Sequence, residues 1–208
     1  MPRSSREKST ETRTNIIEAA YRLFVDHGYN ATSMREISQQ AGVTVGAIYN
    51  HFETKEEIWV EVLKTKHPYH EILPLLQEAE GETVAEMVRS AAQMLVRELR
   101  NRPDLFNLMF IEIVEFQTAH VPDLMQLILP ELVPLQQSFK GKRGRLRSIP
   151  LPILLRSFIG LFFSYYITGI LMKDLPGIST DETSLDKFVD LYLNGILDED
   201  DPSRKRTA

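Results

Sequence analysis

Residues 35–55 read REISQQAGVTVGAIYNHFETK. They predict two helices of about two turns each joined by residues 41–43. The helix lengths and the short turn that contains glycine are typical of a helix-turn-helix. Gly42 lies where the chain must turn sharply, and we expect a positive φ there, which glycine adopts without a Cβ clash. Ile37 and Ile48 fall where the two helices share a small core.

The flanking residues supply matching signals for helix starts. Ser33 followed by Glu36 predicts a capping box that opens the first of the two helices. Thr54 followed by Glu57 predicts a second one, which opens a longer helix after the hairpin. Before the hairpin, an amphipathic helix is predicted over about residues 10–27, and its apolar stripe is formed by Ile16, Ala20, Leu23 and Phe24.

A short helical hairpin alone does not decide whether the segment binds DNA, but the order of the features is more specific. FVDHGYNATSMREISQQAGV (24–43) followed by AIYNHFETKEEI (47–58) resembles the N-terminal domain of TetR/AcrR-family transcriptional regulators over about residues 10–63. The resemblance implies a recognition helix over 44–51 that lies in the major groove.

The same resemblance implies roles for individual residues. The positions that would face bases and nearby phosphates are Thr44, Val45, Gly46, Ala47, Asn50 and His51. Tyr49 and Lys55 match positions that hold the phosphate backbone, and so does either Thr32 or Ser33, at a helix N-terminus that favours anions. Arg3, Arg6 and Lys8 form either a mobile arm on the DNA or a solvated tail.

The recognition helix offers few side-chain donors. Val45, Gly46 and Ala47 supply only methyl contact or close backbone approach to the bases. We therefore expect direct readout to rest on Thr44, Tyr49, Asn50 and His51, with DNA shape providing further specificity.

The rest of the chain predicts an all-α protein, because helical periods recur between glycine and proline punctuation and strand-like alternation is missing. We expect about nine helices. The predicted domains are an arm and helix-turn-helix domain (1–55), a ligand-binding and dimerisation domain (56–197), and a disordered tail (198–208).

Residues 149–172, IPLPILLRSFIGLFFSYYITGILM, are long and apolar enough to span a bilayer. Arg156 and two prolines oppose a membrane span, and a helix that is apolar all round is also typical of a buried core. The family resemblance implies that the last two helices pair with their symmetry mates, so we assign 150–173 and 183–197 to a homodimer interface without a membrane. The predicted interface residues are Phe158, Gly160, Ser164, Thr168, Phe188, Tyr192 and Ile196.

A small-molecule effector site is expected within the larger domain, and its aromatic and methionine content favours an apolar or aromatic effector. The candidate lining residues are Trp59, Phe106, Met109, Phe110, Ile113, Phe116, Phe162, Tyr165 and Tyr166. For each of them, ordinary core packing is the alternative.

Composition excludes several classes of protein. The chain has 208 residues, a formal net charge of −5 and no cysteine, so disulfides and thiolate sites are impossible. The charge divides into +1 for residues 1–55 and −6 for the remainder, so the acidity lies outside the expected DNA-binding segment. The N-terminus lacks the apolar stretch of a signal peptide, and we expect a cytoplasmic location.

No metal or cofactor is predicted. His67, His70 and Glu71 share the spacing of a helical metal site, but Pro68 disturbs the helix there. Glu112 and Glu115 could act as an acid pair, although we expect them to be solvated or to form polar pocket walls.

The sequence therefore predicts a ligand-responsive repressor that binds palindromic operator DNA as a homodimer. An all-helical enzyme and a helical adaptor for protein partners are the rival hypotheses.

Overall fold

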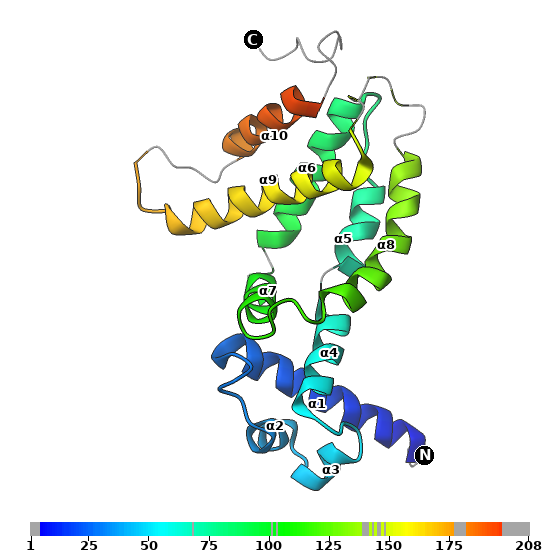
Figure 1. Ribbon diagram of the computed structural model, residues 1–208, viewed down its shortest axis with the longest axis vertical. Helices are drawn as coiled ribbons and strands as arrows, with labels where there is room; N and C mark the ends of the chain where they lie inside the picture. The colour runs from blue at the N-terminus through cyan, green and yellow to red at the C-terminus, as the bar shows by residue number, and fades with distance from the viewer. Residues whose placement is uncertain are drawn as a thin grey trace. The chain divides into compact units, whose positions relative to one another are not determined.

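The regular elements of the described residues are all α-helices, which confirms the predicted fold class (Figure 1). The computed structural model describes residues 5–67, 69–100, 102, 104–138, 142, 144, 147, 149–176 and 182–196. The helices are α1 (Ser5–His27), α2 (Met34–Ala41), α3 (Val45–Tyr49), α4 (Lys55–Lys66), α5 (Tyr69–Gln77), α6 (Val84–Arg100), α7 (Asp104–Val114), α8 (Val121–Ser138), α9 (Leu151–Leu171) and α10 (Glu182–Ile196). There are ten within these residues instead of about nine, because the segment after Thr54 forms both α4 and α5.

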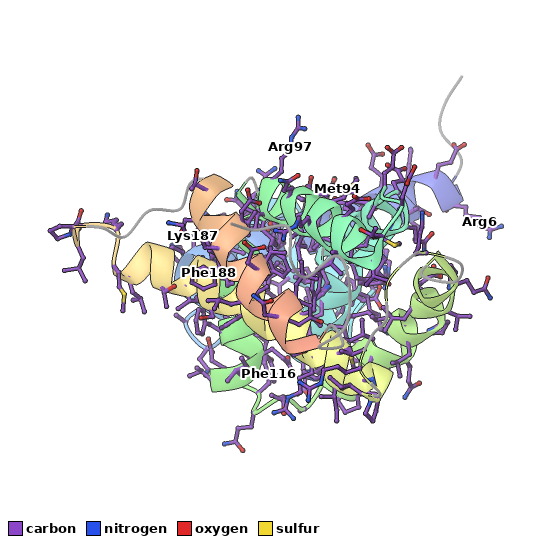
Figure 2. All side chains as sticks on the ribbon, turned by 90° about the horizontal axis from the view of Figure 1, so that it is seen from above. Arg6, Met94, Arg97, Phe116, Lys187 and Phe188 are labelled. Carbon is purple, nitrogen blue, oxygen red and sulfur yellow. The ribbon has the colours of Figure 1, made fainter. Side chains whose placement is uncertain are left out.

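Helix α1 begins earlier than the apolar stripe predicts, at Ser5 instead of about residue 10. Its first turns are polar and exposed, and the hydroxyls of Thr10, Thr12 and Thr14 each donate to the carbonyl four residues earlier. Arg6 therefore projects from a helix and not from an extended arm (Figure 2). Lys8 lies on the same helix, whereas Arg3 lies outside the described residues.

The chain packs as two compact units. Of the described residues, those up to 70 and those from 102 to 130 form the first unit, and those from 71 to 100 and from 131 to 196 form the second. The first unit thus joins the helix-turn-helix to α4 and α7. The predicted boundary after residue 55 divides the chain by role and stays a prediction, as does the tail 198–208, which lies outside the described residues.

One hydrophobic core holds the first unit together. Helices α1, α2, α3, α4 and α7 all contribute to it, and Figure 1 shows α4 crossing α1 with α2 and α3 on the same side of α1. Its fully buried members are Ile16, Ala20, Phe24, Ile37, Ile48, Ile58, Trp59, Val62 and Leu108. The stripe predicted for the first helix therefore faces the core, except that Leu23 is only partly buried.

In the second unit, α10 packs against α6 and α9. Leu185, Val189 and Leu193 form the buried stripe of α10, spaced by four residues as one helix face requires. Asp190 on the same helix forms an ion pair with Arg89 of α6. Further along α6, Arg97 is exposed and projects away from the helices (Figure 2).

Helix α9 is unusually apolar and poorly covered. Its segment Pro152–Leu171 has a mean hydropathy of 1.5, and by length and composition it could cross a membrane. Only 17% of that apolar window is buried within the chain. A large apolar helix surface is therefore left uncovered by the rest of the described residues.

Candidate nucleic-acid interface

Helix α2 begins with the predicted capping box. The Ser33 hydroxyl accepts a hydrogen bond from the Glu36 amide at 3.2 Å, and the Glu36 carboxylate accepts one from the Ser33 amide at 2.7 Å. The hydrogen bonds from Ser33 lower the pKa of Glu36 below its ordinary value. At the other end of α2, Gly42 has φ 68° and ψ 31°, which confirms the predicted left-handed turn.

Helix α3 is short and anchored through one side. Thr44 caps it by accepting a hydrogen bond from the Ala47 amide at 3.1 Å, and Ile48 is completely buried in the core of the first unit. The regular helix covers Val45–Tyr49, while residues 50 and 51 continue it as a turn. This short helix is therefore fixed by its cap and by Ile48, which leaves its outer side open.

The side chains expected to contact DNA lie mainly on that outer side. Thr44, Gly46 and Asn50 are exposed, and Tyr49 exposes 54% of its surface. Val45, Ala47 and His51 are half-buried. The segment thus presents hydroxyl, amide and phenol groups beside a glycine whose backbone is accessible.

The two alternatives at the start of α2 differ in their exposure. Thr32 is only 2% exposed, and its hydroxyl donates to the Gly28 carbonyl at 2.8 Å. Ser33 is exposed at the N-terminus of α2. Of these two hydroxyls, that of Ser33 is the one accessible to a phosphate.

Lys55 is engaged within the protein. Its ammonium donates to the carbonyls of Tyr29 at 2.8 Å and Thr32 at 2.6 Å, and it lies 4.1 Å from the centre of the Tyr29 ring. Burial lowers the pKa of Lys55, while the nearby carboxylates of Glu115 and Glu36 oppose that shift. Two of the three donors of this ammonium are therefore used to brace the turn before α2.

Sequence reasoning missed the role of the segment around the end of α7. Glu112, expected to be solvated or a pocket wall, is buried and accepts from the Trp59 indole at 2.9 Å and from the His120 amide at 2.7 Å. The His120 ring lies 3.1 Å from Glu112 and 3.2 Å from Glu56 of α4. These groups tie α4 to α7 through buried polar contacts.

Glu115 was expected to be solvated or a pocket wall as well, but it contacts the backbone before α2. Its carboxylate accepts hydrogen bonds from the amides of Tyr29 at 3.1 Å and Asn30 at 2.6 Å. A separation of more than eighty residues hides this contact from any local pattern in the sequence. The only signal for it was the presence of acidic residues in an otherwise apolar helical segment.

The predicted effector-site residues of the first unit differ in their burial. Trp59 is fully buried, and Phe116 stacks on it with ring centres 5.3 Å apart. Phe106 is buried, Met109 is half-buried, and Phe110 and Ile113 are exposed. In the second unit, Phe162 and Tyr165 are buried and Tyr166 is half-buried. The predicted effector site stays a prediction.

The first unit also contains an open groove of about 500 Å³ beside α4. Its walls include Arg13, Phe52, Glu56, Glu61, Lys64 and His120. Arg13 and Glu61 form an ion pair at 2.6 Å across α1 and α4. Charged side chains make up half of the residues that line the groove, unlike the apolar site expected for an effector.

The predicted dimer residues divide into two groups. Phe158, Phe188 and Tyr192 make ring contacts within their own unit, and the Tyr192 hydroxyl donates to the Leu154 carbonyl at 3.0 Å. Gly160 and Ser164 are exposed on α9, and Thr168 donates its hydroxyl to the Ser164 carbonyl. The side chain of Ile196 lies outside the described residues.

Comparison with known sequences gives matches to transcriptional regulators. Residues 16–62 match the family described as "Bacterial regulatory proteins, tetR family". YvkB, an HTH-type transcriptional regulator of Bacillus subtilis, is 27% identical over 187 residues, which cover 89% of this chain and 97% of YvkB. The regulator TtgR of Pseudomonas putida is 43% identical over 82 residues, or 39% of each chain.

Solved structures extend the similarity over the whole fold. A TetR family transcription regulator from Marinobacter aquaeolei superposes with a TM-score of 0.64 at 19% identity, covering 93% of this chain and all of its own. NalD of Pseudomonas aeruginosa, the secondary repressor of the MexAB-OprM multidrug efflux pump, gives a TM-score of 0.61 at 20% identity and covers 93% and 99%. At these identities the similarity concerns the fold.

Proposed function

Because this chain belongs to the TetR family of helix-turn-helix transcriptional regulators, which are not enzymes, we propose that it is a cytoplasmic, ligand-responsive repressor. In this proposal a homodimer binds a palindromic operator and is released from it by a small-molecule effector.

The arrangement of α3 is the observation that supports operator binding best. The helix is anchored by the buried Ile48 and capped by Thr44, and Gly46, Tyr49 and Asn50 are exposed on it. A helix held in this way suits the major groove, whose width accepts one helix. Because Ile48 and Thr44 fix the helix on the protein, its exposed face has a defined position for contact with DNA.

Specificity in this proposal comes from a small number of groups. The Asn50 amide is suited to paired hydrogen bonds with adenine, and Thr44, Tyr49 and His51 supply further polar contacts to bases or phosphates. Val45 and Ala47 add methyl contact, and Gly46 permits close backbone approach. Sequence-dependent DNA shape provides the remaining specificity.

Dimerisation through α9 and α10 explains why α9 is so apolar and so poorly covered. Exposed apolar surface of this extent is typical of an interaction site. Gly160 and Ser164 are small and exposed, so they permit close approach of a second α9. A Ser164→Arg variant is expected to sediment as a monomer and to bind operator about 100-fold more weakly, because one recognition helix is lost from the contact.

The effector is proposed to be apolar or aromatic and to lower operator affinity by preferring an arrangement of the dimer that does not fit the two half-sites. An effector that tightened operator binding would reverse the sign of this mechanism.

The test of the proposal is selection of genomic DNA fragments by the purified protein, followed by gel shift with the selected fragments. Operator fragments that share a palindrome support the proposal, and Asn50→Ala is then expected to relax the sequence preference. Failure to retain any fragment above random DNA would favour the adaptor hypothesis instead.

A further inference from the structure

The turn that leads into α2 is held from two sides by charged side chains of distant segments. On one side, the Glu115 carboxylate accepts from the amides of Tyr29 and Asn30, at 3.1 and 2.6 Å. On the other side, the Lys55 ammonium donates to the carbonyls of Tyr29 and Thr32, at 2.8 and 2.6 Å. Residues 29–32 thus lie between an anion at their N–H groups and a cation at their C=O groups.

These charges match the dipoles of the peptide groups, because the anion lies at the N–H groups and the cation at the C=O groups. Hydrogen bonds to ionised groups are stronger than those between neutral groups, and here four of them act on one turn. Burial, followed by the carboxylates of Glu56 and Glu115, raises the pKa of Tyr29, whose ring lies beneath the Lys55 ammonium. The turn is therefore fixed by charge as well as by aromatic packing.

The position of Glu115 is itself well determined. Its amide donates to the Ile111 carbonyl at 2.8 Å, which continues the hydrogen bonding of α7. Its neighbour Phe116 stacks on Trp59 in the core, and Glu112 binds the Trp59 indole. Gly28 has φ 86°, and a Cβ there would lie 3.0 Å from a Glu115 carboxylate oxygen, so the turn and the carboxylate approach closely.

The braced turn ends at Ser33, the N-cap of α2. Any displacement of residues 29–32 would move the first turn of α2, where the Ser33 hydroxyl is exposed. A displacement at the end of α7 would therefore be transmitted through Glu115 and the turn to the start of the helix-turn-helix.

We propose that Glu115 is a positioning residue for operator binding, which fixes the turn before α2 in the arrangement that fits DNA. This inference rests on the proposed function. The effect expected from removing the Glu115 carboxylate is opposite to a simple charge effect. Removal of a carboxylate from a DNA-binding protein ordinarily strengthens binding to any DNA. Loss of the brace instead weakens operator binding selectively.

The experiment compares Glu115→Gln with Glu53→Gln in the full-length protein. Glutamine keeps the size of the side chain, but its NH₂ group cannot accept a hydrogen bond, so one of the two amides loses its partner. Glu53 is exposed two residues after His51, and its replacement removes the same charge. Operator and random DNA are titrated with both variants and the wild type.

Glu115→Gln is expected to bind operator about ten-fold more weakly while its affinity for random DNA stays equal or rises slightly. Glu53→Gln is expected to bind both DNAs equally well or slightly better. Operator affinity of Glu115→Gln equal to that of the wild type overturns the proposal. Equal weakening on both DNAs also overturns it, because that result indicates general loss of folded protein.

Amide hydrogen exchange without DNA separates this inference from the proposed function. Faster exchange at Tyr29 and Asn30 in Glu115→Gln, but not in Glu53→Gln, supports the brace. Unchanged exchange at both amides overturns the brace even if the wild type binds an operator. A wild type that binds no operator overturns the proposed function and the positioning role, even if the exchange result shows the brace itself.

Discussion

Apolar residues are used differently in the first unit and in helix α9 of the second. In the first unit, Phe24, Ile48 and Trp59 come from three helices and are all completely buried in one core. Helix α9 is the more apolar segment, yet Ile159 is 60% exposed and Leu171 is 75% exposed. Apolar composition therefore does not by itself place a residue in the core of its own chain.

The polar contacts differ between these regions as well. In the first unit, Glu112, Glu115 and Lys55 join segments that are far apart in the sequence and satisfy groups inside or beside the core. Around α9 the aromatic side chains pack on one another, with the Tyr192 hydroxyl bonded to a carbonyl. The core of the first unit is therefore held by polar as well as apolar contacts between its helices, whereas much of the apolar surface of α9 is exposed.

The largest effect that tests this comparison is expected from truncating Ile48. Ile48→Ala removes a fully buried side chain and should lower the free energy of unfolding by about 2–5 kcal/mol. Ile159→Ala removes the same atoms from an exposed site and should cost less than about 0.5 kcal/mol in the monomer. Urea unfolding at several protein concentrations measures both values.

The two variants should also differ in how their cost depends on protein concentration. If α9 forms a dimer interface, the cost of Ile159→Ala grows with protein concentration, because dimerisation stabilises the folded state by mass action. The cost of Ile48→Ala stays constant. Equal costs for the two variants at low concentration would contradict the difference between the regions.

The sequence was sufficient for features that depend on neighbouring residues. The capping box at Ser33, the Thr54 cap and the left-handed Gly42 follow from residues at most three positions apart, and the buried Ile37 and Ile48 follow from the same hairpin. The second capping box was wrong in part, because the Glu57 carboxylate accepts from the Glu53 amide instead of the Thr54 amide. The polar start of α1 could not be predicted from an apolar stripe, because its first turns are exposed and bury no apolar side chain.

Contacts between distant segments could not be predicted. Trp59 and Glu112 are 53 positions apart, and the periodicity of either helix gives no reason to pair them. Trp59 therefore matched an apolar effector site as well as it matched a core position. Nothing in the sequence indicates whether a charged side chain such as Glu115 faces water or a backbone turn.

A polar cluster connects α1 and α7 in the first unit. Asp104 accepts hydrogen bonds from the Tyr21 hydroxyl and from Arg102, whose guanidinium lies 3.2 Å away. Burial acts to raise the pKa of Asp104, but these hydrogen bonds outweigh it and lower the pKa below the ordinary value of 3.8. Burial and the bond to Asp104 raise the pKa of Tyr21 to about 12.

A carboxylate whose pKa is lowered by folding stabilises the protein above its unfolded pKa, and this contribution disappears as the pH falls through the folded pKa. Asp104→Asn should therefore cost about 1–2 kcal/mol at pH 7. The difference in stability from the wild type should shrink as the pH falls below 3.8, the ordinary pKa of an aspartate. Urea unfolding between pH 7 and pH 3 measures it. Asp26→Asn, on the exposed face of α1, should change stability by less than about 0.5 kcal/mol at any pH.

The smallest effects are expected at two glycines of the helix-turn-helix, and they should have opposite signs. Gly42 adopts φ 68°, and a Cβ added there would have no other atom within 4 Å, so Gly42→Ala costs only backbone strain, about 1 kcal/mol. Gly46 lies within α3, and a Cβ there would meet only the Thr44 hydroxyl oxygen at 4.0 Å. Gly46→Ala should therefore stabilise the protein by up to about 1 kcal/mol, since alanine favours a helix.

Folding thus gives no reason for a glycine at position 46, and its exposure on α3 points to contact outside the chain. If the backbone at Gly46 approaches the bases, the added methyl group separates the surfaces, and operator affinity should fall by about ten-fold while the melting temperature rises. Thermal melts and operator titrations of the same preparation measure both quantities. A Gly46→Ala variant that is more stable and binds operator as tightly as the wild type would show that the first unit meets DNA through other residues of its surface.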